Sequence, residues 1–303
     1  MIQADWVWRN GQLIPFAEAQ THAITFTLHY GLAVFEGIRC YKRADGRSAL
    51  FRARDHVERL LESAKLATID LKWSADELQA ACVETVKANE LEEGYLRPLV
   101  YVGANSLGIG ARDNPTEVDI IAFPWPPMLG EEGLTNGVRT EISSLSRGHL
   151  GSTLSKAKIS GQYVGSVLAK RQAQRHGCED AIMLDAEGRV AEGTTNNIFI
   201  VWKGALLTPP LEMSILAGIT RDSVIALARD LGIDVVERTF TRDMLCAASE
   251  VFLTGTAVEV TPVREVDGYT IGPPGPITRR LQTAFYTAVR GPGEPHPEWL
   301  TWL

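Results

Sequence analysis

Three side chains in the second half of the chain could together perform amine chemistry. Lys158 lies among small and apolar residues, five positions before Tyr163. Burial among such neighbours favours the free amine, the form of lysine that attacks carbonyl groups. Glu192 follows a predicted strand and precedes a polar turn, where a carboxylate can keep a pyridine nitrogen protonated so that the ring withdraws electrons. An amine, a phenol and an acid are the groups that a pyridoxal phosphate enzyme uses.

Each of these residues also has an ordinary explanation. Most lysines are solvated surface charges, Lys156 lies only two residues before Lys158, and an acid in a turn usually faces water. Residues 218–222 (Gly-Ile-Thr-Arg-Asp) would offer N–H groups and a hydroxyl to a phosphate at a helix start, but every capped helix offers the same. Arg59 and Arg221 are the candidate charges for that phosphate, and spacing alone does not choose between them.

Composition excludes several other classes of protein. The 303 residues are 45% hydrophobic and 22% charged, as in an ordinary globular protein, and long enough for two domains. A net charge of -7 without a basic run disfavours nucleic acid as a partner. The chain has no apolar run of membrane-spanning length and no signal peptide, so we expect no membrane association and a cytoplasmic location. The four cysteines and six histidines lack metal-ligand spacing, so we expect no metal.

The order of predicted elements indicates an α+β fold. Asn10 and Gly11 predict a hairpin turn, and Ser74 with Glu77 predicts the capping box of a helix that follows an earlier helix after Asp55. Strands are expected at 95–102 and 118–123, before a proline-rich run that no strand can continue. We therefore expect a small N-terminal domain over 1–123, an interdomain loop over 124–135 and a large cofactor-binding domain over 136–303.

The second half of the chain mixes short strands and helices. A helix is expected over 161–177 and another from 219, with strands at 181–184, 189–191, 198–202, 206–207, 251–254 and 257–260. These elements lack the regular strand and helix alternation of a doubly wound sheet.

Eight blocks in a fixed order resemble the branched-chain amino acid aminotransferases, pyridoxal phosphate enzymes of fold type IV. The blocks lie at residues 28–31, 34–41, 95–99, 123–125, 157–163, 192–193, 218–222 and 254–257. The resemblance implies a two-domain α+β fold with a small N-terminal α/β domain and a larger, β-rich C-terminal domain with helices.

The resemblance also implies a role for each matched residue. Lys158 would be the catalytic residue, forming the Schiff base with pyridoxal 5'-phosphate and moving the proton at the substrate's Cα. Glu192 would bind the pyridine nitrogen and Tyr163 the phenolic oxygen of the cofactor. The remaining cofactor-binding residues would be Arg59, Ile219, Thr220 and Thr256 at the phosphate, and Leu216 on the ring.

Substrate would lie in a mainly apolar pocket with charges at its edges. Its residues would be Tyr30, Phe35, Gly37, Arg39, Tyr95, Arg97, Ile109, Trp125, Met128, Tyr163, Thr256 and Ala257. Tyr95 and the backbone at Thr256 and Ala257 would take the α-carboxylate, and Arg97 the second carboxylate of glutamate. Two positions depart from the family pattern: Met128 replaces a tyrosine and Asn196 a glutamate. A thioether in place of a phenol would soften the pocket and widen its side-chain range.

The implied reaction transfers the α-amino group between L-leucine, isoleucine or valine and 2-oxoglutarate, by a ping-pong mechanism through pyridoxamine phosphate. A homodimer, or a higher homo-oligomer, would be the active form, with Tyr30 and Ile109 contributed to a neighbouring subunit's pocket. Alternatives on the same fold are a D-amino acid transaminase, an (R)-amine transaminase and an aminodeoxychorismate lyase. A non-catalytic binding protein is the rival from another class.

Overall fold

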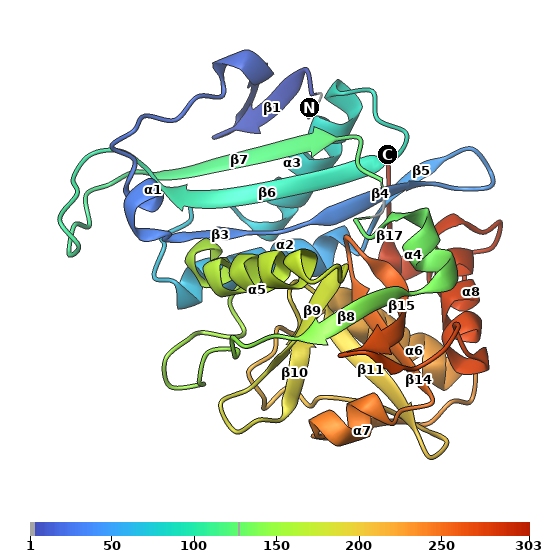
Figure 1. The fold of residues 1–303 in the computed structure, drawn as a ribbon. Helices are drawn as coiled ribbons and strands as arrows, with labels where there is room; N and C mark the ends of the chain where they lie inside the picture. Colours follow the sequence, from blue (N-terminus) through green and yellow to red (C-terminus); the bar gives the residue numbers. More distant parts are fainter. Residues whose placement is uncertain (1–3, 127) are drawn as a thin grey trace. The chain divides into compact units, whose positions relative to one another are not determined.

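The computed structural model describes residues 4–126 and 128–303. Pro127, within the expected interdomain loop, lies outside the described residues. The chain divides into two compact units: Met1–Pro126, Ala157–Gln162 and Ala288–Leu303 form unit 1, and Pro127–Lys156 and Tyr163–Thr287 form unit 2. Each unit combines one β-sheet with helices, as the α+β prediction requires (Figure 1). The predicted domain limits stay a prediction.

Unit 1 is built on an eight-stranded sheet in the order β17-β5-β4-β6-β7-β1-β2, with β3 also paired to β6. Its strands are β1 (Trp6–Arg9), β2 (Gln12–Pro15), β3 (Ala33–Phe35), β4 (Ile38–Lys42), β5 (Ser48–Phe51), β6 (Gly94–Val102), β7 (Thr116–Phe123) and β17 (Leu300–Trp302). Asn10 and Gly11 both take positive φ between β1 and β2, so the predicted hairpin turn is confirmed.

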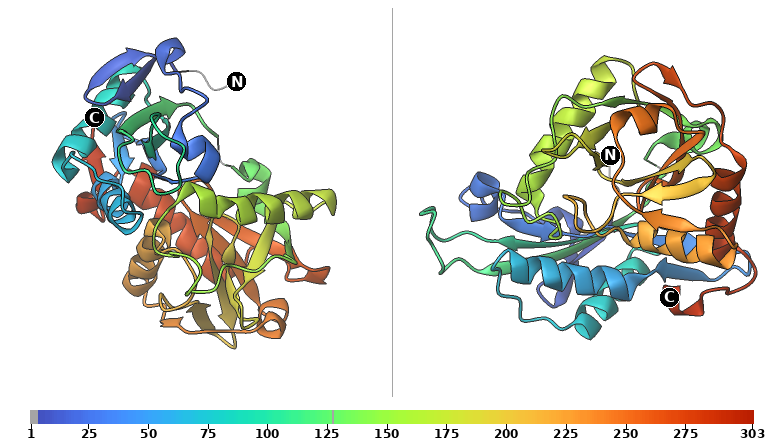
Figure 2. Two further views of the ribbon diagram at one scale, coloured as in Figure 1. Left: turned by 90° about the vertical axis from the view of Figure 1, so that its left-hand side faces the viewer. Right: turned by 90° about the horizontal axis from the view of Figure 1, so that it is seen from below.

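Two helices cover one face of this sheet (Figure 2, right). They are α2 (Ala53–Leu66) and α3 (Ala75–Ala88), and the capping box predicted at Ser74 and Glu77 is present at the start of α3. Apolar side chains from both helices and from β1, β3, β4, β5, β6 and β7 form the buried core beneath them. Shorter helical turns are η1 (Phe16–Glu18), α1 (Phe26–Tyr30), η2 (Ser160–Gln162) and η3 (Pro297–Trp299).

Unit 2 is built on a nine-stranded sheet in the order β10-β9-β8-β15-β14-β11-β12-β13, with β16 added to β15. Its strands are β8 (Val138–Ile142), β9 (Asp180–Leu184), β10 (Val190–Gly193), β11 (Asn197–Trp202), β12 (Ala205–Thr208), β13 (Val235–Glu237), β14 (Glu250–Gly255), β15 (Glu259–Val266) and β16 (Tyr269–Thr270). Its helices are α4 (Gly130–Asn136), α5 (Tyr163–Arg175), α6 (Ile219–Asp230) and α7 (Arg242–Cys246). Helix α8 (Pro276–Arg290) follows β16 in the chain and precedes η3.

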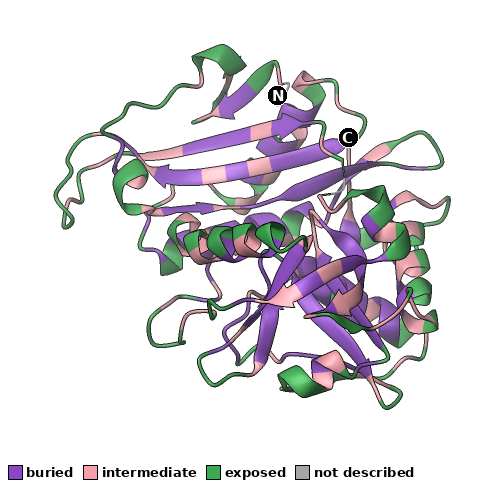
Figure 3. Ribbon diagram, in the orientation of Figure 1, coloured by how far each residue is buried: buried purple, intermediate pink, exposed green. Residues whose placement is uncertain are grey.

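The central strands of both sheets are buried, and the helices expose their outer faces (Figure 3). Strands β11 and β14 consist almost entirely of apolar residues, because both of their faces are covered. Among the described residues, no helix is both long and apolar enough to cross a membrane.

Candidate active site

In unit 1, Lys158 lies on a short segment that is fixed at several points. Its own N–H donates to the Ser63 hydroxyl (3.0 Å) on α2, and its carbonyl accepts from the Phe35 N–H (3.2 Å) on β3. Ile159 forms a β-bridge with Val34. The Lys158 ammonium lies 4.8 Å from the centre of the Phe35 ring. The backbone of the candidate nucleophile is therefore held to the sheet and to α2 together.

Two glycines bring the end of this segment against α1. Gly31, with φ of 69°, ends α1, and its carbonyl accepts from the Gly161 N–H (3.0 Å). A Cβ atom on Gly31 would lie 2.8 Å from the Gly161 Cα atom. Only glycine fits at Gly31, because both the φ angle and the approach exclude a side chain.

The expected substrate residues of β6 gather around aromatic rings. The Arg97 guanidinium lies 4.8 Å from the Phe35 ring centre and 5.6 Å from that of Tyr95. The Arg97 Nε atom is buried and has no hydrogen-bond partner among the described residues. A partly buried cation with an unused donor suits an anionic group of a ligand.

Tyr95 is enclosed by neighbours that fix its ring. It packs edge-on against Trp125, with centroids 4.6 Å apart. A Cβ atom on Gly37 would lie 1.7 Å from the Tyr95 phenolic oxygen, so Gly37 is the residue that leaves room for this phenol. Buried Arg39 donates to the carbonyls of Trp125 (3.3 Å) and Pro126 (3.4 Å). Arg39 thus supports the chain at Trp125 in addition to any contact with substrate.

Tyr30 and Ile109 lie at the edge of unit 1. The Tyr30 hydroxyl donates to the Leu107 carbonyl (2.7 Å), and Ile109 in the same loop is 84% exposed. Neither side chain belongs to the buried core of the unit.

Arg59 on α2, expected at the cofactor phosphate, is held by a neighbour that the sequence alone did not indicate. The Glu36 carboxylate accepts from its Nε (2.6 Å) and Nη2 (2.9 Å) atoms. Arg221, the other candidate cation, lies on α6 of unit 2 and donates to Glu237 (2.7 Å) and to the Pro209 carbonyl (2.8 Å). Arg221 therefore ties α6 to its own unit.

In unit 2, Glu192 on β10 is held as a carboxylate by three donors. Arg147 forms an ion pair with it (2.7 Å), and the Asn197 side-chain amide (3.0 Å) and the Leu216 N–H (3.1 Å) donate to it. The residue is buried, with 5% of its surface exposed. Arg147 carries no local signal for this role, because it lies 45 positions before Glu192, whereas Asn197 lies only five positions after it.

Leu216 and the start of α6 are positioned by the same asparagine. Asn197 also donates to the Leu216 carbonyl (3.0 Å), and a Cβ atom on Gly218 would lie 1.9 Å from the Asn197 side-chain oxygen. Gly218 is the N-cap of α6, so Ile219 and Thr220 form its first turn, where N–H groups favour an anion. Tyr163, the first residue of α5, is half-buried.

The turn between β14 and β15 carries Thr256 and Ala257. The Ala257 carbonyl accepts from the Met128 N–H (3.0 Å), and the Met128 side chain packs on the core of unit 2. Asn196, the other departure from the family pattern, belongs to a buried network: its amide (2.8 Å) and the Thr194 hydroxyl (2.6 Å) both donate to Asp180. These bonds fix the turn that follows Glu192.

Lys156 has a different environment from Lys158. Its ammonium donates to the carbonyls of Met213 (2.8 Å) and Ile215 (2.7 Å) within unit 2. Burial lowers the pKa of Lys156, while the charge of Glu192 opposes that shift. These two hydrogen bonds fix the Lys156 ammonium to the segment that leads into Leu216.

The residues present fit pyridoxal 5'-phosphate. A buried carboxylate that accepts from three donors suits a protonated pyridine nitrogen. An arginine fixed by a carboxylate and the first turn of a helix suit a phosphate, and a lysine on a rigid segment suits an aldehyde.

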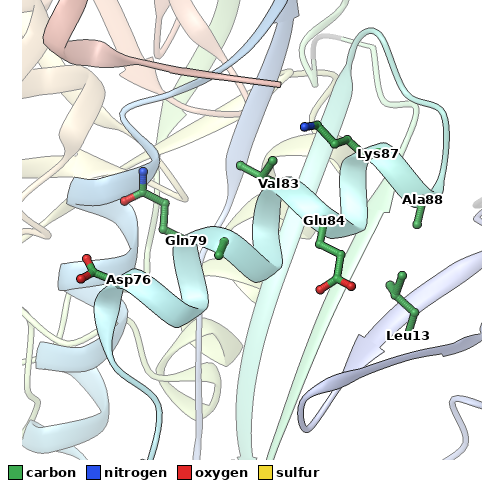
Figure 4. A pocket seen from close by; sticks show the side chains of 8 residues that line it. Leu13, Asp76, Gln79, Val83, Glu84, Lys87 and Ala88 are labelled. Carbon is green, nitrogen blue, oxygen red and sulfur yellow. The ribbon is translucent and has the colours of Figure 1, made fainter.

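The groove shown in Figure 4 is a separate feature of unit 1. It runs along α3 beside β2, and its lining residues are Leu13, Asp76, Gln79, Ala80, Val83, Glu84, Lys87 and Ala88. None of the candidate site residues lines it.

Comparison with known proteins agrees with this chemistry. Residues 33–266 match the amino-transferase class IV family. A branched-chain-amino-acid aminotransferase of Salmonella typhimurium is 43% identical, with 98% of this chain and 97% of the relative covered. The branched-chain amino acid aminotransferase of Escherichia coli superposes with a TM-score of 0.95 at 42% identity, covering 98% and 99% of the two chains.

A second similar structure contains a ligand. It is a branched-chain amino acid aminotransferase of T.th., complexed with N-(5'-phosphopyridoxyl)-L-glutamate, with a TM-score of 0.93, 41% identity, and 100% and 99% of the two chains covered. These matches confirm the predicted α+β fold of fold type IV, which the structure builds on two sheets.

Proposed function

Because the chain belongs to the amino-transferase class IV family, we propose that it transfers the α-amino group between L-leucine, isoleucine or valine and 2-oxoglutarate in two ping-pong half-reactions. Full-length relatives at 42–43% identity are branched-chain-amino-acid aminotransferases, so the chain is a pyridoxal phosphate-dependent enzyme of this kind. The use of 2-oxoglutarate is supported by Arg97, whose buried Nε donor has no hydrogen-bond partner among the described residues.

Both substrates use one pocket in this proposal. A branched aliphatic side chain makes apolar contacts with Phe35 and Trp125, whereas the second carboxylate of 2-oxoglutarate or glutamate pairs with Arg97. A buried carboxylate needs such a partner, because an unpaired buried charge costs several kcal/mol. The phosphopyridoxyl-glutamate adduct in the T.th. relative supports the acidic partner.

Within this proposal each residue has a defined task. Lys158 binds the cofactor covalently at rest and moves the proton at the substrate's Cα. Glu192, oriented by Arg147 and Asn197, pairs with the pyridine nitrogen, so the bound cofactor can supply an electron sink for that proton transfer. Tyr163 donates to the phenolic oxygen, Leu216 packs on the ring, and the N–H groups of Ile219, Thr220 and Thr256 act with Arg59 on the phosphate. Tyr95 and the backbone at Thr256 and Ala257 take the α-carboxylate.

We further propose a homodimer as the minimum active form. In unit 1, Leu28 and Ile109 are 64% and 84% exposed, and in unit 2 Val164, Val167 and Leu168 of α5 are exposed. Exposed large apolar side chains of this kind support an association surface. Sedimentation velocity should give a dimer or a larger closed assembly, and a monomer at micromolar concentration with full activity would refute this part.

The location proposed is cytoplasmic, in keeping with four cysteines that form no disulfide.

Spectral titration of the separate half-reactions tests the function. The purified protein should absorb visible light, and L-leucine and L-glutamate should each shift that absorbance, whereas D-amino acids and (R)-arylalkyl amines should be much slower. A colourless protein that binds no cofactor would indicate a binding protein. A faster reaction with D-amino acids or (R)-amines would assign one of the related transaminase activities instead.

A further inference from the structure

One face of α2 in unit 1 carries three polar residues. His56, Arg59 and Ser63 are separated by three and four positions, which places them along one side of the helix. His56 and Ser63 have no exposed surface. Burying polar groups is unfavourable unless each finds a partner, so a helix face of this kind indicates a specific task.

Glu36 is the common partner of two of these residues. Its carboxylate has no exposed surface and accepts from Arg59 Nε (2.6 Å), Arg59 Nη2 (2.9 Å) and His56 Nδ1 (2.7 Å). Burial alone would raise the pKa of Glu36, but the Arg59 charge, together with the bonds from His56 and Arg59, outweighs it and holds the pKa well below its usual value. The carboxylate is thus charged and bonded to the guanidinium at two points.

The two-point bond fixes the direction of the arginine. A free arginine side chain carries about 2 kcal/mol of rotamer entropy, and a bidentate carboxylate removes much of that freedom before any ligand binds. Glu36 takes two of the five N–H donors of Arg59. Such a buried ion pair adds little to the net stability of the fold, because the cost of desolvation offsets most of the attraction between the charges.

The same short segment also fixes the candidate nucleophile. Glu36 follows Phe35, whose N–H donates to the Lys158 carbonyl (3.2 Å), and Ser63 on the same face of α2 accepts from the Lys158 N–H (3.0 Å). Residues 34–37 and this face of α2 therefore set the positions of Arg59 and Lys158 together.

We infer that Glu36 and His56 are positioning residues, which present the Arg59 guanidinium to the phosphate of the cofactor. The inference rests on the proposed role of Arg59 as a phosphate ligand. It predicts that a change at Glu36 acts on cofactor binding only through the phosphate and only through Arg59.

The test compares two aldehydes that differ in the phosphate alone. The full-length chain, stripped of cofactor, is titrated with pyridoxal 5'-phosphate and with pyridoxal, following the absorbance of the bound aldehyde. Glu36→Gln should weaken pyridoxal phosphate about tenfold or more and pyridoxal less than about twofold. In an Arg59→Met background, Glu36→Gln should have no further effect. Glu93→Gln, which removes a carboxylate from an exposed ion pair with Arg290 in the same unit, is the matched control and should change neither affinity.

Each other outcome overturns the inference in a distinct way. Equal losses for both aldehydes would assign Glu36 to the fold. A phosphate-dependent loss in Arg59→Met without one in Glu36→Gln would remove Glu36 from this role and leave Arg59 in place. No phosphate-dependent loss in Arg59→Met would refute the phosphate role itself. Circular dichroism shows whether Glu36→Gln folds. If it does not, Glu36→Asp, which keeps the charge but shortens the side chain by one methylene group, must give the same loss of affinity for pyridoxal phosphate and not for pyridoxal.

Discussion

Lys156 and Lys158 are two residues apart, yet the structure gives them different surroundings. The spacing to Tyr163 and the family resemblance selected Lys158, and the fold gives the two lysines different contacts: Lys156 donates to two carbonyls, whereas Lys158 lies beside the Phe35 ring. Glu192 could likewise be proposed from its turn, but Arg147, which holds it, lies 45 positions earlier in the chain. The candidate catalytic residues lie in local patterns, whereas Arg147 and Ser63, which hold Glu192 and Lys158, lie far from them in the sequence.

Arg97 should discriminate between the two proposed substrates. Arg97→Met removes the cation for the second carboxylate, so 2-oxoglutarate and glutamate should bind roughly 2–5 kcal/mol more weakly. Leucine should lose much less, because its side chain makes apolar contacts only. Separate half-reaction titrations measure both values in one protein, and equal losses would assign Arg97 to the α-carboxylate or to the fold.

Glu192→Gln should slow proton removal from the substrate's Cα by about 100-fold, equivalent to roughly 3 kcal/mol, while the cofactor stays bound. A neutral amide leaves the pyridine nitrogen less protonated, and the ring then withdraws fewer electrons. Stopped-flow absorbance with leucine gives the rate. Glu187→Gln, in the exposed turn between β9 and β10, is the matched control and should react normally. A change below about threefold in Glu192→Gln would make it a structural acid.

Among the helices, strands and turns, the sequence predicted those features that neighbouring residues determine. The turn at Asn10 and Gly11 and the capping box of α3 are set by neighbouring residues, and both were predicted. Strand β17 was not predicted, because three residues carry no periodicity and their pairing with β5 joins positions about 250 residues apart. The fixing of residues 157–162 by Ser63, Phe35 and Gly31 is also long-range.

Gly31→Ala tests whether the contact between Gly31 and Gly161 positions the segment that carries Lys158. The new Cβ atom would lie 2.8 Å from the Gly161 Cα atom, so the segment that carries Lys158 should shift and the half-reaction rate should fall at least tenfold. Gly46→Ala is the matched control, because Gly46 also has positive φ, 84°, but has no atom within 4 Å of the added Cβ. Both changes should cost about 1 kcal/mol of stability from φ alone, and only Gly31→Ala should lose rate. Equal rates in both variants would show that the contact does not position Lys158.

At the scale of the whole molecule, buried His56 links stability to pH. Burial lowers its pKa, and the positive charges of Arg59 and Lys158 add to this effect, while Glu36 opposes it. Unfolded histidine titrates near 6.5, so below that pH the unfolded chain binds a proton that the native chain does not, and stability falls by up to about 1.4 kcal/mol per pH unit. The lowered pKa of Glu36 adds a second loss only below about pH 4.5, its unfolded value.

Urea unfolding at pH 7.5 and 5.5 measures this linkage. The loss of stability on acidification should be smaller in His56→Gln, which keeps a donor for Glu36 but cannot take up a proton. An unchanged pH slope in that variant would mean that His56 is protonated in the native protein and that its burial has been offset by Glu36.

Borohydride reduction tests whether Lys158 carries the cofactor. Reduction of the holoenzyme, followed by proteolysis and fragment-ion mass spectrometry, should place the phosphopyridoxyl group on Lys158. Lys156→Ala should keep that label, and Lys158→Ala should lose both the label and turnover. A label on Lys156, or one that persists in Lys158→Ala, would show that another amine carries the cofactor.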